Sequence, residues 1–484
     1  MAQARSAEQL AAAGAANGTP GELTATPAAG AAARGGAGWL GQLSWALCDG
    51  ARSPYNVLVN IFVFAAYFTT VVIPDAVRGQ TVWSYVSALA ALLVALGAPV
   101  LGAIADAGGR RKPWLVGCLV LGAPCMTLLW FATPGMTSGL AWIMVGVIGG
   151  YLCFEYSAVF TSAMLPNVAP PGRLGFLSGL GFCMANLSGI VLFLFYLLAW
   201  DRNPHPLFGL DVAAHEPERA VGILAAVWLV VFYLPMFAFT PDSARTSRSM
   251  GAAVRHGLRS LLATLSRLRG YRNTATFLAA RLLYNEGFIV MMLFTSVVAA
   301  GVLHWTPRML IAMGLINSVV AAAAGLFAGW LDVRVGSKPA AMVFVAGCML
   351  ANIVVCSITP DAIFFLKLPA AGAPAHGLFP SLPDKVFLVT QNLIALFVTG
   401  GLVTSRTLMA KLSPPHMLNE FFGLYALSGN ATSFVGPLAI GLVTSAFASQ
   451  RAGVAVGVVF LLAGLLLLIP VREVLTPAAA LRGH

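Results

Sequence analysis

Apolar stretches of about 20 residues recur along almost the whole chain, and this feature restricts the possible folds more than any other. A helix of that length crosses about 30 Å of hydrocarbon. Only 9% of the 484 residues are charged and the mean hydropathy is +0.85, whereas soluble domains carry about 25% charged residues. The sequence therefore excludes a soluble enzyme, a fibrous protein and a disordered chain, and it predicts an all-α polytopic membrane protein.

The apolar stretches number about twelve and fall into two sets of six. They lie near residues 43–73, 82–105, 113–133, 138–165, 174–200, 219–240, 273–302, 308–330, 339–358, 386–410, 420–447 and 452–471. Alternation with a period of two is absent from them, which argues against a β-barrel. We therefore expect two pseudo-symmetric six-helix bundles, a linker between them and two tails. The ranges are 1–38 for a disordered cytoplasmic tail, 39–240 and 273–471 for the bundles, 241–272 for the linker and 472–484 for the second tail.

Lysines and arginines outside the expected spans fall mainly on one side of the membrane, eighteen against seven. By the positive-inside rule this bias places both termini in the cytoplasm, and it predicts a multi-pass protein of the plasma membrane, which is the inner membrane in a bacterium. The linker 241–272 contains seven arginines and is expected to lie on the cytoplasmic lipid surface. A regulatory or lipid-sensing role of this linker is the alternative.

Composition narrows the function classes further. The net charge of +11 is explained by the positive-inside bias, and no basic segment is long enough to form a nucleic-acid-binding domain. The seven cysteines lie in apolar segments without metal-ligand spacing, and the seven histidines form no metal motif. The sequence contains no phosphate-cradling loop. We expect a monomer in the lipid bilayer that is not an enzyme and that holds no metal or other cofactor.

A short polar motif, GAIADAGGRRK at 102–112, separates the second and third apolar stretches. It resembles the signature loop G-x-x-x-D-(R/K)-x-G-(R/K)-(R/K) of the major facilitator superfamily, with Ala107 in place of a basic residue. The matching residues are Gly102, Asp106, Gly109, Arg110 and Arg111. Gly102 would let two helices approach closely, and Asp106 would accept hydrogen bonds from a neighbouring helix N-terminus or pair with a basic residue. Such a latch forms in one conformation and breaks in the other.

A degenerate copy of the motif, GWLDVRVGSK, lies between the eighth and ninth stretches at 329–338. Its Asp332 and Arg334 are the expected second latch, and an ordinary basic turn is the alternative. Two sets of six helices, a basic central loop and this repeated motif together resemble the major facilitator fold. The two halves of that fold rock about a site near the bilayer midplane.

Several further segments, in the same order along the chain, resemble the vacuole-effluxer-like family of autophagy-related amino-acid effluxers. They are WALCDGARSPY at 45–55, APVLG at 98–102, ARLLYNEG at 280–287, SR at 405–406, EFFGLY at 420–425 and GP at 436–437. The resemblance runs from about residue 39 to 471, and it implies an amino-acid exporter. This chain departs from the family pattern where Arg52 replaces Asn, where Pro54 interrupts the first span and where Glu286 replaces Asp.

Six ionisable side chains fall inside the expected spans. They are Asp49, Arg52, Glu155, Arg281, Glu286 and Arg406. Each costs about 2.5–3.5 kcal/mol at the bilayer centre on insertion scales, a cost that pairing or a watery cavity must offset. We therefore expect these residues to face the cavity between the halves. Asp49 and Arg52 are three residues apart and can pair, either for binding or as a local structural ion pair. Glu155 has no basic residue within a turn, which suits reversible protonation; the alternative is a hydrogen-bonded structural acid.

Separated positive and negative groups at mid-depth would suit a zwitterion such as an amino acid. The expected substrate-binding residues are Asp49, Arg52, Tyr55, Arg281, Asn285, Glu286 and Gln391. The expected proton-coupling residues are Glu155, Asp49 and Glu286. Arg406 and Glu420 both lie near a cytoplasmic helix end and are expected to form a gate or a structural pair.

The sequence thus predicts a secondary active transporter that works by alternating access and moves a small polar solute. Protons are the expected coupling ion, with sodium as the alternative, and export is implied by the family resemblance. Two other functions stay open. A sugar–cation symporter of the glycoside-pentoside type would place stacking aromatics near the midplane, and a lipid flippase would need a lateral opening with an apolar lining.

Overall fold

The computed structural model describes residues 37–108, 110–169, 174–200, 207–242, 270–369, 377–413, 421–422, 424–425, 428–429 and 431–473. The side chains of 103–108, 166 and 174–175 are outside this description. The expected N-terminal tail, most of the arginine-rich linker and most of the C-terminal tail therefore lie outside the described residues. Within 37–484 the chain forms one compact unit.

Six apolar spans make up the N-terminal half. The first span consists of four consecutive elements: α2 (Trp39–Pro54), η1 (Tyr55–Phe62), α3 (Phe64–Tyr67) and η2 (Phe68–Val72). The other five spans are α4 (Ala76–Gly108), α5 (Lys112–Thr127) with η3 (Leu128–Phe131), α6 (Leu140–Val168), α7 (Leu174–Phe195) with η4 (Tyr196–Trp200), and α8 (Glu216–Phe239). A short turn, η5 (Leu207–Gly209), precedes α8. Pro54, which the sequence suggests as an interruption, does not end the first span. The helix continues beyond it as the wider π-helix η1. The Gly50 carbonyl oxygen, which the proline leaves without its helical N–H partner, accepts hydrogen bonds from Ser188 Oγ at 2.8 Å and from Trp228 Nε1 at 3.3 Å.

Six further spans make up the C-terminal half. They are α10 (Arg272–Leu303), α11 (Pro307–Val335), α12 (Ser337–Ser357), α13 (Leu382–Leu412), α15 (Val435–Phe447) with the helical residues before it, and α16 (Gln450–Leu468). A two-residue hairpin, β1 (Ala362–Ile363) and β2 (Leu366–Lys367), lies in the connection between α12 and α13, with Ala362 opposite Lys367.

The predicted all-helical membrane fold is confirmed. Eleven helices in the described part of the chain are long and apolar enough to cross a membrane, and α15 is a shorter apolar helix of 13 residues. The eleventh span differs from the continuous stretch predicted at 420–447. Its described residues before 430 are helical, residues 431–434 form a turn, and α15 starts at Val435.

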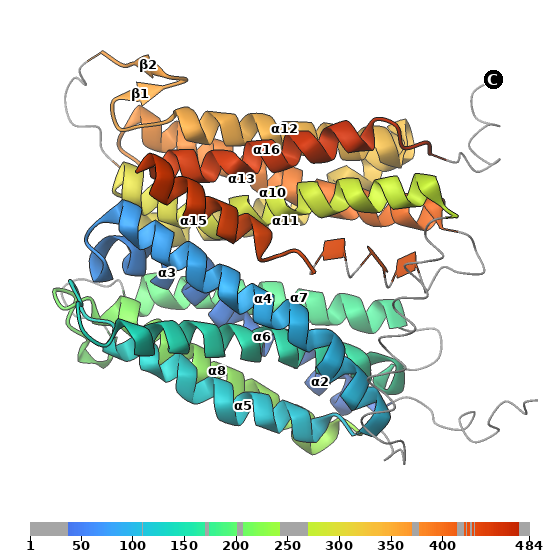
Figure 1. Cartoon of the computed structure of the whole chain (residues 1–484). Helices are drawn as coiled ribbons and strands as arrows, with labels where there is room; N and C mark the ends of the chain where they lie inside the picture. The colour runs from blue at the N-terminus through green and yellow to red at the C-terminus, as the bar shows by residue number, and fades with distance from the viewer. Residues whose placement is uncertain are drawn as a thin grey trace, which may run out of the picture. The chain divides into compact units, whose positions relative to one another are not determined.

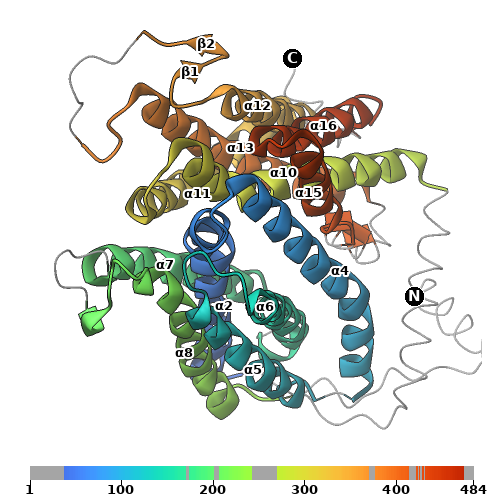
Figure 2. The same ribbon diagram turned by 60° about the vertical axis from the view of Figure 1, so that its left-hand side comes forward.

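The spans of each half pack mainly on one another: α2 on α7 and α8, and α10 on α16. Figures 1 and 2 show these two groups, with α4 of the N-terminal half lying beside α15 of the C-terminal half. We call the end where α4 and α11 begin the far end, and the end where α5, α10 and α12 begin the linker end. The halves meet near the far end.

Hydrogen bonds across the halves form a cluster that we call the far-end seal. Gln80 of α4 donates through Nε2 to Thr444 Oγ1 at 2.8 Å and to the Gln450 carbonyl oxygen at 3.0 Å. Gln450 in turn donates to the Ala76 carbonyl oxygen at 3.0 Å. The Gln80 side chain is fully buried. The seal therefore consists of uncharged amide and hydroxyl groups.

Candidate functional site

A cavity of about 410 Å³ lies between the two halves. Its wall combines η1, α4 and α6 with α10, α13 and the residues around the start of α15. The lining residues are Asn56, Asn60, Ile61, Ser87, Ala90, Ala91, Val94, Val147, Tyr151, Phe154, Glu155, Arg281, Asn285, Ile289, Met292, Leu293, Leu402, Gly429, Ser433 and Pro437. A pocket of this size is typical of small-molecule sites.

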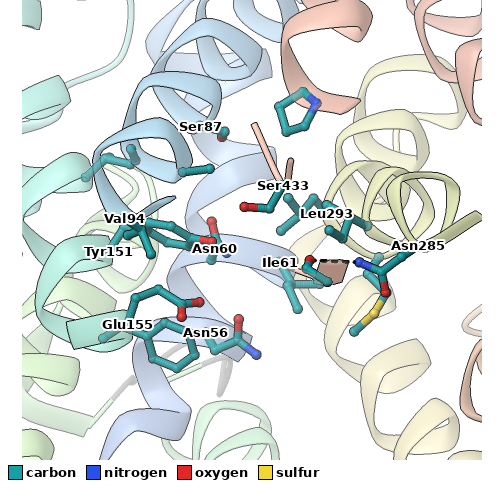
Figure 3. A pocket seen from close by; sticks show the side chains of 18 of the residues that line it. Asn56, Asn60, Ile61, Ser87, Val94, Tyr151, Glu155, Asn285, Leu293 and Ser433 are labelled. Atoms are coloured by element: carbon teal, nitrogen blue, oxygen red, sulfur yellow. Dashed lines mark hydrogen bonds between the residues drawn. The ribbon is translucent and has the colours of Figure 1, made fainter. Parts of the chain in front are cut away.

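The polar groups of this cavity are divided between its two walls. In Figure 3, Tyr151 and Glu155 of α6 lie on one side, Asn285 lies on the other, and Asn56 and Asn60 lie between them. The Glu155 carboxyl group interacts electrostatically with Arg52 of the first span and with the Tyr151 side chain one turn earlier on α6. The sequence shows no basic residue within a turn of Glu155, and the cation that acts on it comes from the first span instead.

Arg281 and Asn285 are two of the predicted substrate-binding residues, and the structure places both in the wall of this cavity. The Arg281 guanidinium lies 3.6 Å from the centre of the Tyr425 ring, and its Nη1 donates to the Tyr425 carbonyl oxygen and to Ser428 Oγ, each at 2.7 Å. Its Nε has no hydrogen-bond partner among the described residues. The side chain is only 6% exposed, so a buried cation forms part of the cavity wall.

A second cavity of about 220 Å³ adjoins the first, since both are lined by Asn56, Ile61 and Met292. Gln391, a third predicted substrate-binding residue, lines it and accepts a hydrogen bond from Thr295 at 3.0 Å. The wall also includes the side chains of Phe62, Phe193, Met291, Ile394 and Val398. This second cavity is therefore mainly apolar.

The other predicted binding residues are not among the described residues that line either cavity. Asp49 and Arg52 form the ion pair that their spacing predicts, and Arg52 lies 5.6 Å from the centre of the Phe154 ring. The Tyr55 hydroxyl donates to the Val147 carbonyl oxygen at 2.5 Å and is buried. None of these three side chains is among the residues that line these two cavities. The expectation that all the intramembrane charges face the cavity is therefore wrong for Asp49 and Arg52.

Glu286 also differs from that expectation. Its side chain is 1% exposed and accepts a hydrogen bond from the Gly436 N–H at 2.9 Å, in the first turn of α15. Its other oxygen, Oε1, has no hydrogen-bond partner among the described residues. The α10 side chains of Arg281, Asn285 and Glu286 all contact the eleventh span. Because residues 281 and 286 point in different directions around α10, Arg281 and Asn285 also line the cavity, whereas Glu286 does not.

The first latch motif is described only in part, because the side chain of Asp106 and all of Gly109 lie outside the described residues. A Cβ added to Gly102 would lie 3.9 Å from Val159 Cγ1, an ordinary contact. The expectation that Gly102 permits a close helix approach is therefore wrong for this conformation. Arg110 lies 3.7 Å from Asp242, whose carboxylate also accepts a hydrogen bond from the Arg111 N–H at 2.9 Å.

Asp242 is a functional candidate that the sequence reading missed, and Glu473 is its counterpart in the other half. Asp242 follows α8 and accepts backbone hydrogen bonds at the start of α5 from Arg111 and Lys112. Glu473 follows α16 and accepts backbone hydrogen bonds at the start of α12, from the N–H of Ser337 at 3.0 Å and of Lys338 at 2.8 Å. We call each arrangement a carboxylate clamp. The sequence signal was an acid a few residues after the sixth span of each half.

The two residues of the expected second latch, Asp332 and Arg334, contact different partners. Asp332 is 9% exposed and lies 3.9 Å from Lys411 Nζ, which also binds Glu473 at 2.8 Å. Arg334 lies over the exposed Trp330 ring at 4.3 Å.

The expected gate consists of Arg406 and Glu420. Arg406 is exposed, and Glu420 lies outside the described residues, so the gate pair stays a prediction. Among the described residues, no group of three His, Cys, Asp or Glu side chains could hold a metal ion.

Two six-helix halves with a cavity between them that contains charged and amide side chains define a carrier of the major facilitator type. A family model described as "Vacuole effluxer Atg22 like" matches residues 68–172 and 175–474. The chain belongs to this family, as the motifs at 45–55 and 280–287 predict.

Relatives and solved structures agree with this assignment. The chain is 24% identical over 438 residues to the "Uncharacterized MFS-type transporter YxiO" of Bacillus subtilis (strain 168), a match that covers 89% of this chain and 94% of that protein. It is 28% identical over 240 residues to "Autophagy-related protein 22-1" of Neosartorya fischeri, covering 47% of this chain and 36% of that protein. The match thus spans about a third of this fungal relative's length.

Similar solved structures include a bacterial homologue of the human lysosomal transporter Spinster in an inward-facing, unoccupied conformation. It has a TM-score of 0.62 at 13% identity and covers 89% of this chain and 95% of that one. A D-xylose–proton symporter has a TM-score of 0.60 at 12% identity and covers 90% of this chain and 97% of that one. At these identities the likeness concerns the fold alone.

Proposed function

We propose that the chain is a secondary carrier that moves a small zwitterionic solute, such as an amino acid, by alternating access. The observation that supports this proposal is the charge on the two cavity walls, where Glu155 of α6 and Arg281 of α10 line one cavity from opposite halves. A solute with a carboxylate and an ammonium group would bind both walls at once. Such binding would favour closure of the halves around the solute.

Each wall has a chemical role in this proposal. Arg281 binds the solute carboxylate, since a guanidinium presents donors in a fork that matches a carboxylate. Glu155 receives either the solute ammonium group or a proton, and alternation between the two would couple transport to a proton gradient. Sodium is the alternative coupling ion. The amides of Asn56, Asn60 and Asn285 orient the solute through neutral hydrogen bonds.

We further propose that the linker end faces the cytoplasm and that export is the direction of transport. The linker end carries Arg110, Lys112, Arg334, Lys338 and Lys411, in agreement with the positive-inside rule. The far-end seal then closes the cavity on the external side, so this structure corresponds to the inward-facing state. Export is supported by membership of the effluxer family.

A binding screen tests the substrate class. Purified carrier is heated with single amino acids, dipeptides, sugars, nucleosides or lipids, because a ligand that binds the native state raises the melting temperature. We expect amino acids to raise it, and we expect N-acetylated or amidated amino acids to do so far less because each lacks one charge. Stabilisation by sugars or nucleosides but not by amino acids would refute the zwitterion proposal.

Glu155→Gln tests the coupling. In proteoliposomes this variant should lose uptake driven by a pH gradient, while exchange of labelled for unlabelled solute continues because exchange needs no net proton movement. Ser87→Ala is the matched control, since it removes a neutral polar group from the part of the same cavity that the N-terminal half lines, and it should keep proton-driven uptake. Proton-driven uptake at the wild-type rate in Glu155→Gln would reject Glu155 as the coupling residue.

A further inference from the structure

The break in the eleventh span lies directly against α10, and three α10 side chains provide its hydrogen-bond partners. Before the break, Arg281 Nη1 donates to the Tyr425 carbonyl oxygen at 2.7 Å, and Asn285 Nδ2 donates to the Gly429 carbonyl oxygen at 3.0 Å. After the break, Glu286 accepts a hydrogen bond from the Gly436 N–H at 2.9 Å. Side-chain donors on α10 therefore bind the carbonyl oxygens before the break, and a side-chain acceptor on α10 binds the backbone N–H after it.

This arrangement follows from the cost of an unpaired backbone group in a membrane. A continuous helix pairs its own N–H and C=O groups, but a helix that stops inside the bilayer leaves carbonyls at one end and amides at the next start. The segment 431–434 turns within the span and pairs part of its own backbone, since the Val435 N–H donates to the Thr432 carbonyl oxygen at 2.7 Å. The carbonyls of Tyr425 and Gly429 and the N–H of Gly436 find partners on α10. Arg281, Asn285 and Glu286 occupy positions i, i+4 and i+5 of α10, and together they match the polarity of both ends.

The same three residues connect the cavity to the far-end seal. Arg281 and Asn285 line the large cavity. Glu286 binds the first turn of α15, and α15 packs across the halves on α4 and carries Thr444, which accepts a hydrogen bond from Gln80 in the seal. A shift at the start of α15 would therefore reach the seal along a single helix of 13 residues.

We propose that residues 431–434 are a hinge and that Arg281, Asn285 and Glu286 are positioning residues that couple occupancy of the cavity to the far-end seal. The bond from Gly436 N–H to Glu286 belongs to the state in which the far end is closed, and it breaks when α15 swings away from α4. An anionic solute group at Arg281 competes with the Tyr425 carbonyl oxygen for the guanidinium and thereby loosens the hinge. This inference rests on the proposed carrier function and requires only that the solute has an anionic group.

The test uses Glu286→Ala and Glu286→Gln in the full-length carrier in lipid nanodiscs. Spin labels at Arg78→Cys and Ser445→Cys, both exposed positions near the far end, report the distance between α4 and α15 by pulsed electron paramagnetic resonance. The exposed Cys183 is replaced by Ser. Loss of a hydrogen bond to a charged group should raise the population with the longer distance about tenfold in Glu286→Ala.

Glu286→Gln distinguishes the hinge from a proton-coupling role. A glutamine side-chain oxygen can still accept from the Gly436 N–H, so its distance distribution should stay within about threefold of wild type. A wild-type distribution in Glu286→Ala would overturn the proposal. So would equal shifts in Glu286→Ala and Glu286→Gln, because the charge rather than the hydrogen bond would then set the conformation.

A second variant keeps the test meaningful if Glu286→Ala folds poorly. A Cβ at Gly436 would lie 2.9 Å from Glu286 Oε2, so Gly436→Ala should separate the two groups and produce the same long distances. Gly325→Ala is the matched control, since a Cβ there meets no atom within 4 Å. Short distances in Gly436→Ala, in protein that elutes as a single species, would also overturn the hinge. A failed amino-acid screen would refute the proposed substrate and leave these distances unaffected.

Discussion

Gly441→Ala should shift the carrier away from the state in which the far end is closed. Gly441 lies on the face of α15 that packs against α4 in the other half. A Cβ at this position would lie 2.7 Å from Tyr85 Cε1, 2.9 Å from Tyr85 Cδ1 and 3.1 Å from Ser84 Cβ. The tyrosine ring can rotate, but Ser84 Cβ is fixed to the α4 backbone, so α4 and α15 must move apart.

The size of the effect follows from the cost of overpacking. One extra methyl group in a packed interface costs about 1–3 kcal/mol. The methyl group costs nothing in a state where α4 and α15 have separated. At 1.36 kcal/mol for each factor of ten, the ratio of closed to open far end should fall by about 5-fold to 150-fold. The gain in helix propensity from glycine to alanine, about 0.5–1 kcal/mol, is present in both states and cancels.

The assay is the distance between spin labels at positions 78 and 445 without solute. Gly441→Ala should transfer population from the short distance to a longer one, while its melting temperature stays near that of wild type. Gly325→Ala, where the added methyl group meets open space, should leave the distribution unchanged. An unchanged distribution in Gly441→Ala would refute the claim that contact between α4 and α15 closes the far end.

Three further outcomes are expected. Tyr55→Phe should lower the free energy of unfolding by about 1–2 kcal/mol, and with it the melting temperature, because the Tyr55 hydroxyl donates to the Val147 carbonyl oxygen. It should leave the affinity for the solute unchanged, and a weaker affinity in a binding titration would show that Tyr55 takes part in solute binding. Gln80→Ala should raise the open far-end population like Gly441→Ala, and a double variant no more open than either alone would show that both act on one contact. Burial alone would raise the pKa of Glu473, but hydrogen bonds from Lys411 and from the backbone of residues 337–338 outweigh burial and hold this pKa below its ordinary value of 4.5. The stability that this clamp adds is therefore fully present above pH 4.5, and it is lost as the pH falls through the lowered pKa. Glu473→Gln should flatten the fall of melting temperature in that acidic range, and an unaltered fall would contradict the clamp.

The sequence predicted the spans well because hydropathy reports burial in lipid directly. The expectation of a continuous eleventh span passed over the polar run SGNATS at 428–433, which is a turn signal. The α10 groups that bind on both sides of the break could not be predicted from this run. Pro54 gave the opposite error: Ser188 and Trp228, from neighbouring helices, satisfy the Gly50 carbonyl oxygen that the proline leaves unpaired, and the span continues.

The candidate site was predicted in part for a similar reason. Arg281 and Asn285 share one face of α10, and the structure places both in the cavity wall. Asp49 and Arg52 satisfy each other locally, so their burial needs no cavity. The cost of an intramembrane charge shows that it has a partner, but it does not distinguish a solute, another side chain or a backbone amide as that partner.

The two carboxylate clamps have a consequence for how such a protein can evolve. Asp242 and Glu473 differ in length and stand at different distances from the ends of α8 and α16, yet each bridges two neighbouring amides at a helix start. Natural selection can therefore preserve the location of the oxygen atoms while the acid itself changes type and shifts along the chain. A comparison that matches the two halves on their motif glycines, Gly102 and Gly329, would miss this correspondence, because Asp242 and Glu473 stand at different distances from those glycines along the chain.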